Sequence, residues 1–277
     1  MLFDFHVHSN ISLDSDESME ATIDMATRRG LTGLCFTDHC DLVDYFTYTS
    51  YPGERKLDCF DTWSRSYAAI AQARAWAREI GLTIEILHGI ELGDIVQEPE
   101  WAREIAASPD LDCVLGSVHA VMGSTEFSLI DFPDVSGCKQ QMSDYLDEIL
   151  RMVRYDLTDL VSHIGYPNRY MARQGFSVDM TEFTEQLRAI FEVVIQNGRG
   201  IEVNTSGLRQ GAGITFPDLP TLKLYREMGG EIITLGSDAH RAENVGDNFA
   251  DAVEMLQTAG FRYTSVFRRR KAEFVRL

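Results

Sequence analysis

Short apolar or β-branched runs alternate with longer amphipathic stretches along the whole 277-residue chain. This alternation is typical of parallel strands joined by helical crossovers, because each parallel strand needs a long connection to return the chain to the same edge of the sheet. We predict strands at residues 2–8, 33–38, 83–91, 112–119, 159–164, 200–204 and 231–237. We predict helices at residues 18–29, 59–80, 98–107, 139–155, 179–197, 217–228 and 247–258. The expected fold class is α/β.

Seven strand-then-helix units predict a barrel of seven or eight strands, and the chain length is close to the ~250 residues of one α/β barrel. An open doubly wound sheet has the same alternation and is the alternative. No Pro/Ser-rich linker divides the chain, so residues 1–277 are expected to form a single domain. The long loops 39–58 and 120–138 are expected to act as lids or substrate walls. The basic run 268–271 is interpreted as a solvated face.

The charge balance disfavours some classes of partner. The sequence has 25 Lys and Arg against 43 Asp and Glu, a formal net charge of -18. Nucleic acid and anionic membranes are bound through Lys and Arg, so neither is expected as a partner. The five cysteines contain no C-x-x-C pair, the first residues lack the features of a signal peptide, and no apolar run approaches ~20 residues. We therefore expect a cytoplasmic protein, while its oligomeric state stays open.

Histidines and carboxylates gather at the ends of the predicted strands. In a parallel α/β barrel the carboxyl ends of all strands meet on one face, so these side chains become neighbours in space. The pairs His6/His8 and Asp238/His240 are spaced i, i+2, which points both members of each pair to one side. The candidate metal ligands are His6, His8, Asp14, His39, Glu91, His119, His163, Asp238 and His240. Because one ion takes three or four protein ligands, this set predicts two or three divalent ions.

The ligand types restrict the choice of metal. Imidazole and carboxylate without thiolate suit zinc, manganese or iron. His88 lies inside a predicted strand on the opposite side from Glu91, so a packing or supporting role is favoured for it. Asp14 has a second interpretation, since it lies where it could cap the helix that begins near Met19.

Seven blocks of the sequence together resemble the PHP superfamily of polymerase and histidinol phosphatase domains, and in particular its histidinol-phosphate phosphatase branch. They occur in the family's order over nearly the whole chain, which makes the resemblance specific. The blocks are Asp4-Phe5-His6-Val7-His8-Ser9, Phe36-Thr37-Asp38-His39, Gly89-Ile90-Glu91, Gly116-Ser117-Val118-His119, Ser162-His163-Ile164-Gly165, Glu202-Val203-Asn204-Thr205-Ser206-Gly207-Leu208-Arg209 and Gly236-Ser237-Asp238-Ala239-His240.

The resemblance implies a distorted (β/α)7-type barrel that holds three divalent ions. The implied ligand sets are His6, His8, Glu91 and Asp238 for one ion, Glu91, His119 and His163 for a second, and Asp14, His39 and His240 for a third. Some family members have histidine where this chain has Asp14, although a carboxylate is also a competent ligand. Asp38 is expected to orient His39 or a metal-bound water, with a helix cap as the alternative.

Two arginines match positions that bind phosphate in the histidinol phosphatase branch. They are Arg169 and Arg209, with Arg173 as a competitor for the first role. A guanidinium suits phosphate because its fork donates two parallel hydrogen bonds.

The resemblance thus implies a metal-dependent phosphomonoesterase that hydrolyses L-histidinol phosphate in histidine biosynthesis. In this reading a hydroxide that bridges two ions attacks phosphorus, because metal coordination lowers the pKa of water. The partner is then a small phosphorylated substrate. Its cationic amine is expected at Asp41 or Asp44 in the long loop 39–58.

Three other functions are kept as alternatives. A PHP phosphoesterase that acts on a small nucleotide or another phosphate ester shares most of these motifs. An amidohydrolase-type barrel also begins with His-x-His, but it normally has a further histidine after the sixth strand, where this chain reads Glu202-Val203-Asn204. A metal-binding scaffold without activity would have lost ligands, and none of the nine is missing.

Overall fold

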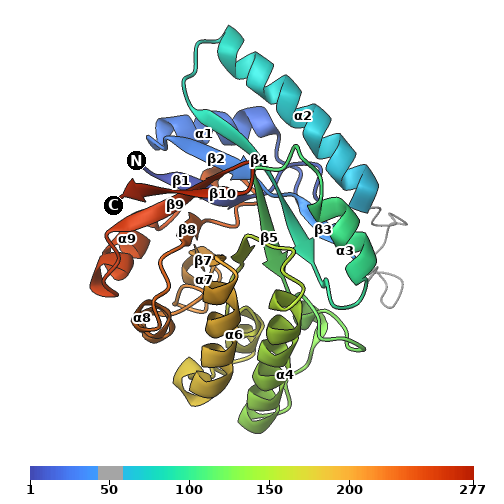
Figure 1. Ribbon diagram of the computed structural model, residues 1–277, viewed down its shortest axis with the longest axis vertical. Coiled ribbons are helices and arrows are strands. Elements are labelled where there is room, and N and C mark those ends of the chain that lie inside the picture. Colours follow the sequence, from blue (N-terminus) through green and yellow to red (C-terminus); the bar gives the residue numbers. More distant parts are fainter. Residues whose placement is uncertain (43–58) are drawn as a thin grey trace.

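The computed structural model describes residues 1–42 and 59–277 (Figure 1). Seven parallel strands pair in the order β1, β2, β4, β5, β6, β7 and β8, and the short β3 pairs with β4. Their bounds are β1 Phe3–Val7, β2 Gly33–Phe36, β3 His39–Asp41, β4 Glu85–Gly93, β5 Cys113–Ser117, β6 Leu160–Val161, β7 Gly200–Asn204 and β8 Ile233–Gly236. All seven predicted strands are present. β3 was expected to be part of a loop.

The first strand meets the chain that follows the last one. The Asp238 amide donates to the His6 carbonyl oxygen at 2.8 Å, and the His8 amide donates to the Ala239 carbonyl oxygen at 2.9 Å. The sheet therefore closes almost completely into a barrel, and the alternative of an open sheet is wrong. β1, β2, β5, β7 and β8 are buried along their whole length, as expected for parallel strands covered on both faces.

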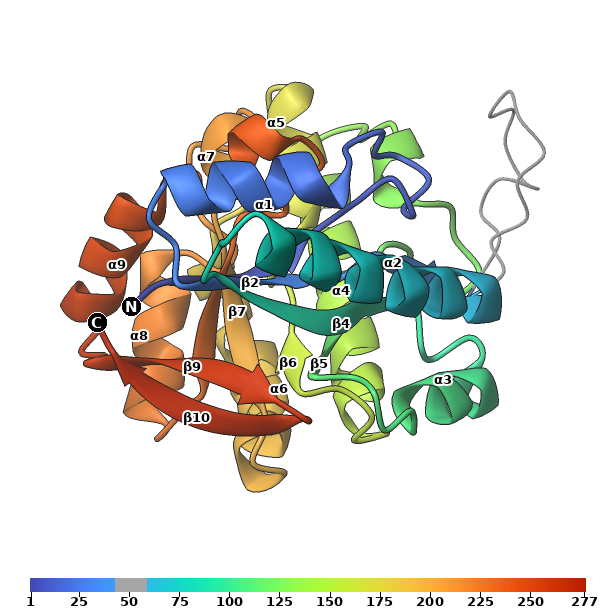
Figure 2. The ribbon, with the colours of Figure 1, turned by 90° about the horizontal axis from the view of Figure 1, so that it is seen from above.

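Helices surround the barrel (Figures 1 and 2). They are α1 Met19–Arg28, α2 Cys59–Glu79, α3 Pro99–Ala106, α4 Val135–Val153, α5 Pro167–Arg173, α6 Thr184–Gln196, α7 Ser206–Arg209, α8 Leu219–Glu227 and α9 Phe249–Thr258. Side-chain caps set several starts: Ser18, Asp134 and Asp218 each accept a hydrogen bond from an amide in the first turn. Because Asp134 caps α4, that helix begins at residue 135 rather than 139, and the expected loop 120–138 is shorter than predicted.

An antiparallel hairpin covers the amino-terminal end of the barrel and was not predicted. It consists of β9 (Tyr263–Arg268) and β10 (Lys271–Arg276). Val266 and Phe267 of β9 pack with Phe3, Phe5 and other side chains of the barrel interior. Figure 2 shows the hairpin at the opposite edge of the molecule from α5 and α7. The barrel is thus closed at one end, and its functional residues lie at the other.

The basic run 268–271 forms the tip of this hairpin, so its interpretation as a solvated face is wrong for two of the four residues. Arg270 Nε lies 2.8 Å from Asp159 Oδ2, and its Nη atoms donate to the carbonyl oxygens of Ala106 and Leu157. Arg268 pairs with Glu85 at 2.6 Å. Both arginines fasten the hairpin to the barrel. Within the described residues no helix is long and apolar enough to cross a membrane.

Candidate metal centre

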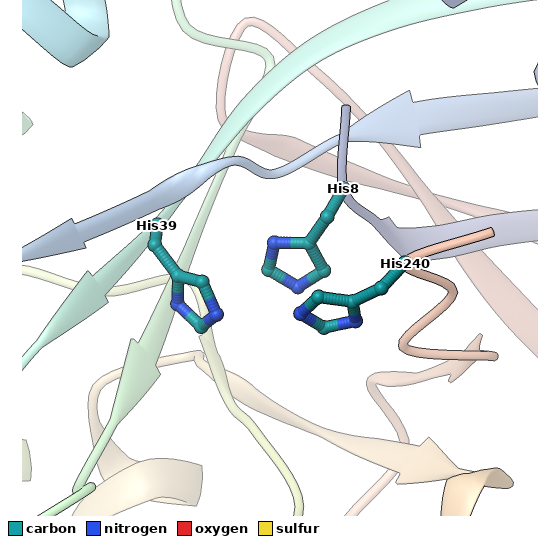
Figure 3. Close-up of side chains that lie close together, drawn as sticks. All are labelled: His8, His39 and His240. Carbon is teal, nitrogen blue, oxygen red and sulfur yellow. The ribbon is translucent and has the colours of Figure 1, made fainter. Parts of the chain in front are cut away.

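The predicted ligands meet at the carboxyl ends of the strands. His6 and His8 lie at the end of β1, His39 begins β3 and Glu91 lies in β4. The remaining ligands follow the ends of strands: His119 after β5, His163 after β6, and Asp238 and His240 after β8. The ring centroids of His8 and His240 are 4.0 Å apart, and those of His8 and His39 are 4.3 Å apart (Figure 3). The structure therefore brings together side chains that are separated by up to 234 positions, from residue 6 to residue 240.

Glu91 lies at the centre of the cluster and is 1 % exposed. Its two carboxylate oxygens contact five imidazoles, those of His6 (3.3 Å), His8 (3.5 Å), His39 (2.8 Å), His119 (3.3 Å) and His163 (2.9 Å). Ser117 donates its hydroxyl to Glu91 Oε1 at 2.6 Å, which orients the carboxylate. A carboxylate between two groups of imidazoles has the arrangement of a bridging ligand.

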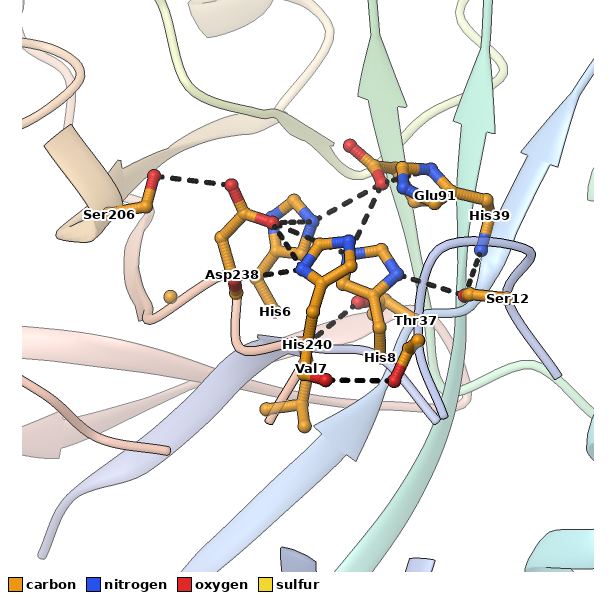
Figure 4. A network of polar contacts seen from close by, with 12 residues as sticks. His6, Val7, His8, Ser12, Thr37, His39, Glu91, Ser206, Asp238 and His240 are labelled. Atoms are coloured by element: carbon orange, nitrogen blue, oxygen red, sulfur yellow. Dashed lines mark hydrogen bonds and ion pairs between the residues drawn. The ribbon is translucent and has the colours of Figure 1, made fainter. Parts of the chain in front are cut away.

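Asp238 is a second carboxylate of the cluster and lies next to three of its imidazoles (Figure 4). Its Oδ1 lies 3.5 Å from His8 Nε2, 3.5 Å from His240 Nδ1 and 3.8 Å from His6 Nε2. The backbone of Asp238 has a φ of 53°, an unusual value for a residue other than glycine. This backbone conformation places the carboxylate among the imidazoles.

Asp14 reaches the cluster from the loop after β1. Its Oδ2 lies 2.9 Å from His240 Nε2 and 3.5 Å from His39 Nε2. The alternative that Asp14 caps the following helix is not what the structure shows, because the side chain of Ser18 caps α1 by accepting from the Ala21 amide at 3.2 Å.

Several ligand atoms are buried without a hydrogen-bond partner among the described residues. They are His6 Nε2, His8 Nε2, His39 Nδ1, Glu91 Oε2 and His163 Nδ1. Buried polar atoms are almost always paired, and leaving one unpaired is costly. Donor atoms within 4.8 Å of one another form four groups: His8/His39/His240, His6/His8/Asp238, His6/Glu91/His163 and His39/Asp41/His119. These imidazole and carboxylate groups fit divalent cations, so the residues present suit the metals that the sequence predicts.

The electrostatics of the cluster also suit cations. Burial alone would raise the pKa of Glu91, but the imidazoles of His6, His39 and His119 hold that pKa well below its usual range. Burial lowers the pKa of His8, and neighbouring imidazoles lower it further. Ligation requires an ionised carboxylate and a neutral imidazole, which are the forms favoured for Glu91 and His8. Burial lowers the pKa values of His6, His39 and His119, but nearby carboxylates raise them well above the usual range, so these rings would release a proton when a cation binds.

Three polar side chains contact the Nδ1 atoms of His6, His8 and His119, whose Nε2 atoms face Glu91. Glu202 Oε1 lies 2.7 Å from His6 Nδ1, and Ser12 Oγ lies 3.0 Å from His8 Nδ1. Asp41 Oδ1 lies 2.8 Å from His119 Nδ1. Glu202 was not among the predicted site residues, although a glutamate inside a buried strand is a signal that the sequence contains.

Two expectations concern carboxylates of the long loop 39–58. Asp41 was expected to receive the substrate's amine, but its carboxylate is engaged with His119. Asp44 lies outside the described residues. The packing role expected for His88 agrees with the structure, since its ring is buried against Tyr67 of α2 with ring centroids 5.7 Å apart.

Asp38 is connected to the ligands through a serine. Its carboxylate accepts hydrogen bonds from the Ser9 amide (2.7 Å) and from the hydroxyls of Ser9, Ser12 and Ser66. The Ser12 hydroxyl in turn lies 3.0 Å from His8 Nδ1 and accepts from the His39 amide at 3.0 Å. Asp38 is thus linked to both histidines through Ser12, and its role in orienting His39 or a metal-bound water stays a prediction.

The two predicted phosphate-binding arginines lie beside Asp238. Arg169 of α5 is 6 % exposed, and its Nη2 donates to Asp238 Oδ2 at 2.6 Å and to the Ser206 hydroxyl. Arg209 of α7 donates from its two Nη atoms to the carbonyl oxygens of Ser237 and Asp238, both at 2.6 Å. A guanidinium has five N–H groups, so each arginine keeps donors for a further partner.

Arg173, the competitor for the first role, is exposed at the end of α5. Its guanidinium lies 5.0 Å from the centroid of the Tyr170 ring, a cation–π contact. The structure therefore favours Arg169 over Arg173 as the arginine beside the metal ligands.

Comparison with known proteins agrees with the site. A "Probable histidinol-phosphatase" of Clostridium acetobutylicum is 27% identical over 265 residues, which cover 95% of this chain and 95% of that protein. The histidinol-phosphatase of Lactococcus lactis is 26% identical over 95% of this chain and 93% of its own length.

A solved structure is similar over the same extent. The crystal structure of histidinol phosphate phosphatase from Lactococcus lactis, in complex with zinc, L-histidinol and phosphate, matches with a TM-score of 0.79 and 26% identity. The match covers 98% of each chain. The sequence profile of the PHP domain matches residues 4–206, which is most of the chain and includes seven of the nine predicted ligands. On this match, and with the ligand cluster in place at the strand ends, the chain belongs to the PHP domain family.

Proposed function

We propose that this protein is a metal-dependent phosphomonoesterase that hydrolyses L-histidinol phosphate to L-histidinol and phosphate, a reaction of histidine biosynthesis. One observation carries the proposal: nine ligand-type side chains and two arginines converge at one end of a barrel whose other end is closed. The similarity to a histidinol phosphate phosphatase solved with zinc, L-histidinol and phosphate supports the choice of substrate. We further propose that residues 1–277 form one cytoplasmic domain.

The proposed ligand sets are those that the family resemblance implies, and the contacts of Glu91, Asp238 and Asp14 with the imidazoles support them. His6, His8, Glu91 and Asp238 would hold one ion, Glu91, His119 and His163 a second, and Asp14, His39 and His240 a third. The central position of Glu91 supports its role as the shared ligand. Zinc, manganese and iron all suit this chemistry. When bound, such ions supply Lewis acidity, which lowers the pKa of water and polarises phosphoryl oxygens.

The chain's own residues supply orientation and charge. Arg169 and Arg209 flank Asp238, so their free N–H groups can donate to the equatorial oxygens of a phosphate placed at the ligands. Such bonds strengthen as negative charge spreads over those oxygens during transfer. The partners of the ring nitrogens, Glu202, Ser12 and Asp41, hold the imidazoles in place, which reduces reorganisation during the reaction.

The surroundings of the centre favour a cationic leaving group. A cavity of about 620 Å³ opens beside Asp14 and His240. Its wall also carries three carboxylates, Asp16, Glu17 and Glu243, against one cation, Arg241, which lies 4.0 Å from Glu243. Such a wall attracts the ammonium group of histidinol and repels additional negative charge. This supports an amino alcohol phosphate over a nucleotide that carries several phosphates.

A substrate panel tests the proposal. Purified protein is assayed for release of phosphate from L-histidinol phosphate and from nucleoside monophosphates, and for cleavage of a dipeptide. We expect the highest kcat/KM with L-histidinol phosphate, complete loss after exhaustive chelation, and recovery when zinc, manganese or iron is returned. Preference for a nucleotide or for the dipeptide would replace the proposed substrate. Activity that survives removal of all metal would refute the mechanism.

A further inference from the structure

Glu202 lies in the middle of β7, a strand that the proposed ligand sets do not use. Its side chain is fully buried. One oxygen, Oε1, lies 2.7 Å from His6 Nδ1. The other, Oε2, accepts hydrogen bonds from the His163 amide at 2.8 Å and from Asn204 Nδ2 at 3.2 Å. A single carboxylate thus contacts two proposed metal ligands, His6 in β1 and His163 in the loop after β6.

The contact with His6 sets the direction of that ring. As a metal ligand the His6 imidazole would be neutral, with one N–H donor and one lone pair, and a carboxylate can only accept. Donation from Nδ1 to Glu202 therefore leaves the lone pair on Nε2. His6 Nε2 lies 3.3 Å from Glu91 Oε2 and 3.8 Å from Asp238 Oδ1, the two carboxylates of the proposed ligand set. The lone pair thus points towards the two carboxylates that would share a metal ion with His6.

The contact with His163 sets a backbone conformation. His163 has a φ of 24°, which is strained for a residue with a side chain. The Glu202 carboxylate accepts from the amide of this residue, and the ring then reaches Glu91 with its Nε2 2.9 Å from Oε1. The hydrogen bond helps hold a conformation that the isolated chain disfavours.

The neighbouring strand leaves room for this pair. A Cβ atom at Gly236, at the end of β8, would overlap Glu202 Oε1 and would lie 2.6 Å from His6 Cβ. Only glycine at this position lets the carboxylate reach the ring without a shift of one of them. Ser12 and Asp41 hold His8 and His119 by the same nitrogen, Nδ1, so the arrangement recurs in the centre.

We propose that Glu202 is a positioning residue that fixes the ring of His6 and the backbone of His163 for metal binding. The inference rests on the ligand set of the proposed function. Partners of this kind typically change metal affinity by about 10- to 100-fold when they are removed.

The variant Glu202→Gln tests the inference with little change of shape. A carboxylamide has one accepting oxygen, so it cannot accept from both His6 Nδ1 and the His163 amide. Glu148→Gln is the matched control, because Glu148 is equally buried but lies in α4 and pairs with Arg151 at 3.0 Å. Each protein is stripped of metal, its melting temperature is measured, and its zinc affinity is determined by competition with a chromophoric chelator.

We expect Glu202→Gln to bind its weakest zinc equivalent at least 10-fold less tightly than the parent, and to recover turnover when zinc is added in excess. Glu148→Gln should stay within twofold of the parent in affinity. Zinc affinity of Glu202→Gln within twofold of the parent would overturn the inference, whatever its melting temperature. If that variant does not fold, the zinc-loaded parent is examined by nitrogen-15 NMR. We expect an exchange-protected Nδ1–H of His6, and its absence would overturn the inference.

The zinc measurements do not depend on the substrate. A parent that does not hydrolyse L-histidinol phosphate, together with weaker zinc binding by Glu202→Gln, would refute the proposed substrate and support the inference. A parent that hydrolyses L-histidinol phosphate, together with unchanged zinc binding by Glu202→Gln, would support the proposed substrate and refute the inference.

Discussion

Replacing Arg209 by alanine gives the sharpest test of phosphate recognition. The Arg209 guanidinium makes two charge-assisted hydrogen bonds at 2.6 Å, to the carbonyl oxygens of Ser237 and Asp238. These bonds use one N–H of each Nη atom, so up to three N–H groups remain for phosphate oxygens. The backbone bonds hold the guanidinium in position before the substrate arrives, and this preorganisation makes the contact effective in the transition state.

The expected loss can be estimated from the number of bonds. Hydrogen bonds that involve a charged group contribute about 1.5–3 kcal/mol each. A bidentate contact with phosphate, partly replaced by water in the variant, then corresponds to roughly 3 kcal/mol of transition-state stabilisation, which is on the order of a 10²-fold loss of kcat/KM. Metal content should not change, because two hydrogen bonds still hold Asp238. Its amide donates to the His6 carbonyl oxygen at 2.8 Å, and its carboxylate accepts from Arg169 at 2.6 Å.

The assay is phosphate release from L-histidinol phosphate, with metal content measured on the same samples. Arg209→Lys should recover part of the activity, since an ammonium supplies the charge without the planar fork. Arg173→Ala is the control, because Arg173 is exposed and stacks on Tyr170, and it should stay within twofold of the parent. If kcat/KM of Arg209→Ala is within threefold of the parent at matched metal content, Arg209 does not hold the phosphate, and the role passes to Arg169.

Three further perturbations test other parts of the structure. Asp14→Ala should lose about one ion per chain while keeping its fold, because the other ligand sets stay complete, and elemental analysis with circular dichroism checks this; full metal content would rule out Asp14 as a ligand. Arg270→Ala should lower the free energy of unfolding by about 2–3 kcal/mol without changing kcat, because it removes a pairing with the buried Asp159 far from the site. Urea unfolding measures this loss, and an unchanged unfolding midpoint would show that Arg270 does not stabilise the contact between the hairpin and the barrel. Burial lowers the pKa of His88 to about 4, so the folded protein keeps this ring neutral while the unfolded chain protonates it below pH 6.5. Stability present above pH 6.5 is therefore lost as the pH falls towards 4, and the parent should lose about 2.5 kcal/mol more than His88→Gln between pH 7.5 and 4.5. Equal losses in the two proteins would show that His88 does not titrate in this way.

The strand positions and the proposed ligands could be predicted because both depend on local patterns. A buried parallel strand is a short apolar run, and the residue that follows it lies at the face where all strands end. His119, His163 and Asp238 were recognised in this way from the sequence, and the structure brings them together. The prediction needed the strand ends and the topology, and it did not need the packing of individual side chains.

The hairpin β9–β10 was missed because its pattern is weak. β10 has exposed and half-buried positions without strict alternation and contains Lys271, Glu273 and Arg276, so it resembles a charged tail. Its strand conformation depends on pairing with β9 and on the packing of Val266 and Phe267 against the barrel interior. Neither the pairing with β9 nor the packing against the barrel can be recognised from a few consecutive residues of the sequence.

The roles of Glu202, Asp41 and Asp38 were also decided by the tertiary structure. Each carboxylate is within reach of several polar groups, and the choice among them depends on which strands are neighbours and in which register. β7 places Glu202 beside His6 across the closing barrel, and β3 places Asp41 beside His119. The sequence by itself determined which residues lie at the open end of the barrel, because that follows from strand periodicity. Only the closed sheet decided which side chains hydrogen-bond to the rings of the proposed ligands, because hydrogen bonds of 2.7–3.0 Å require atomic positions that residues far apart in the chain set jointly.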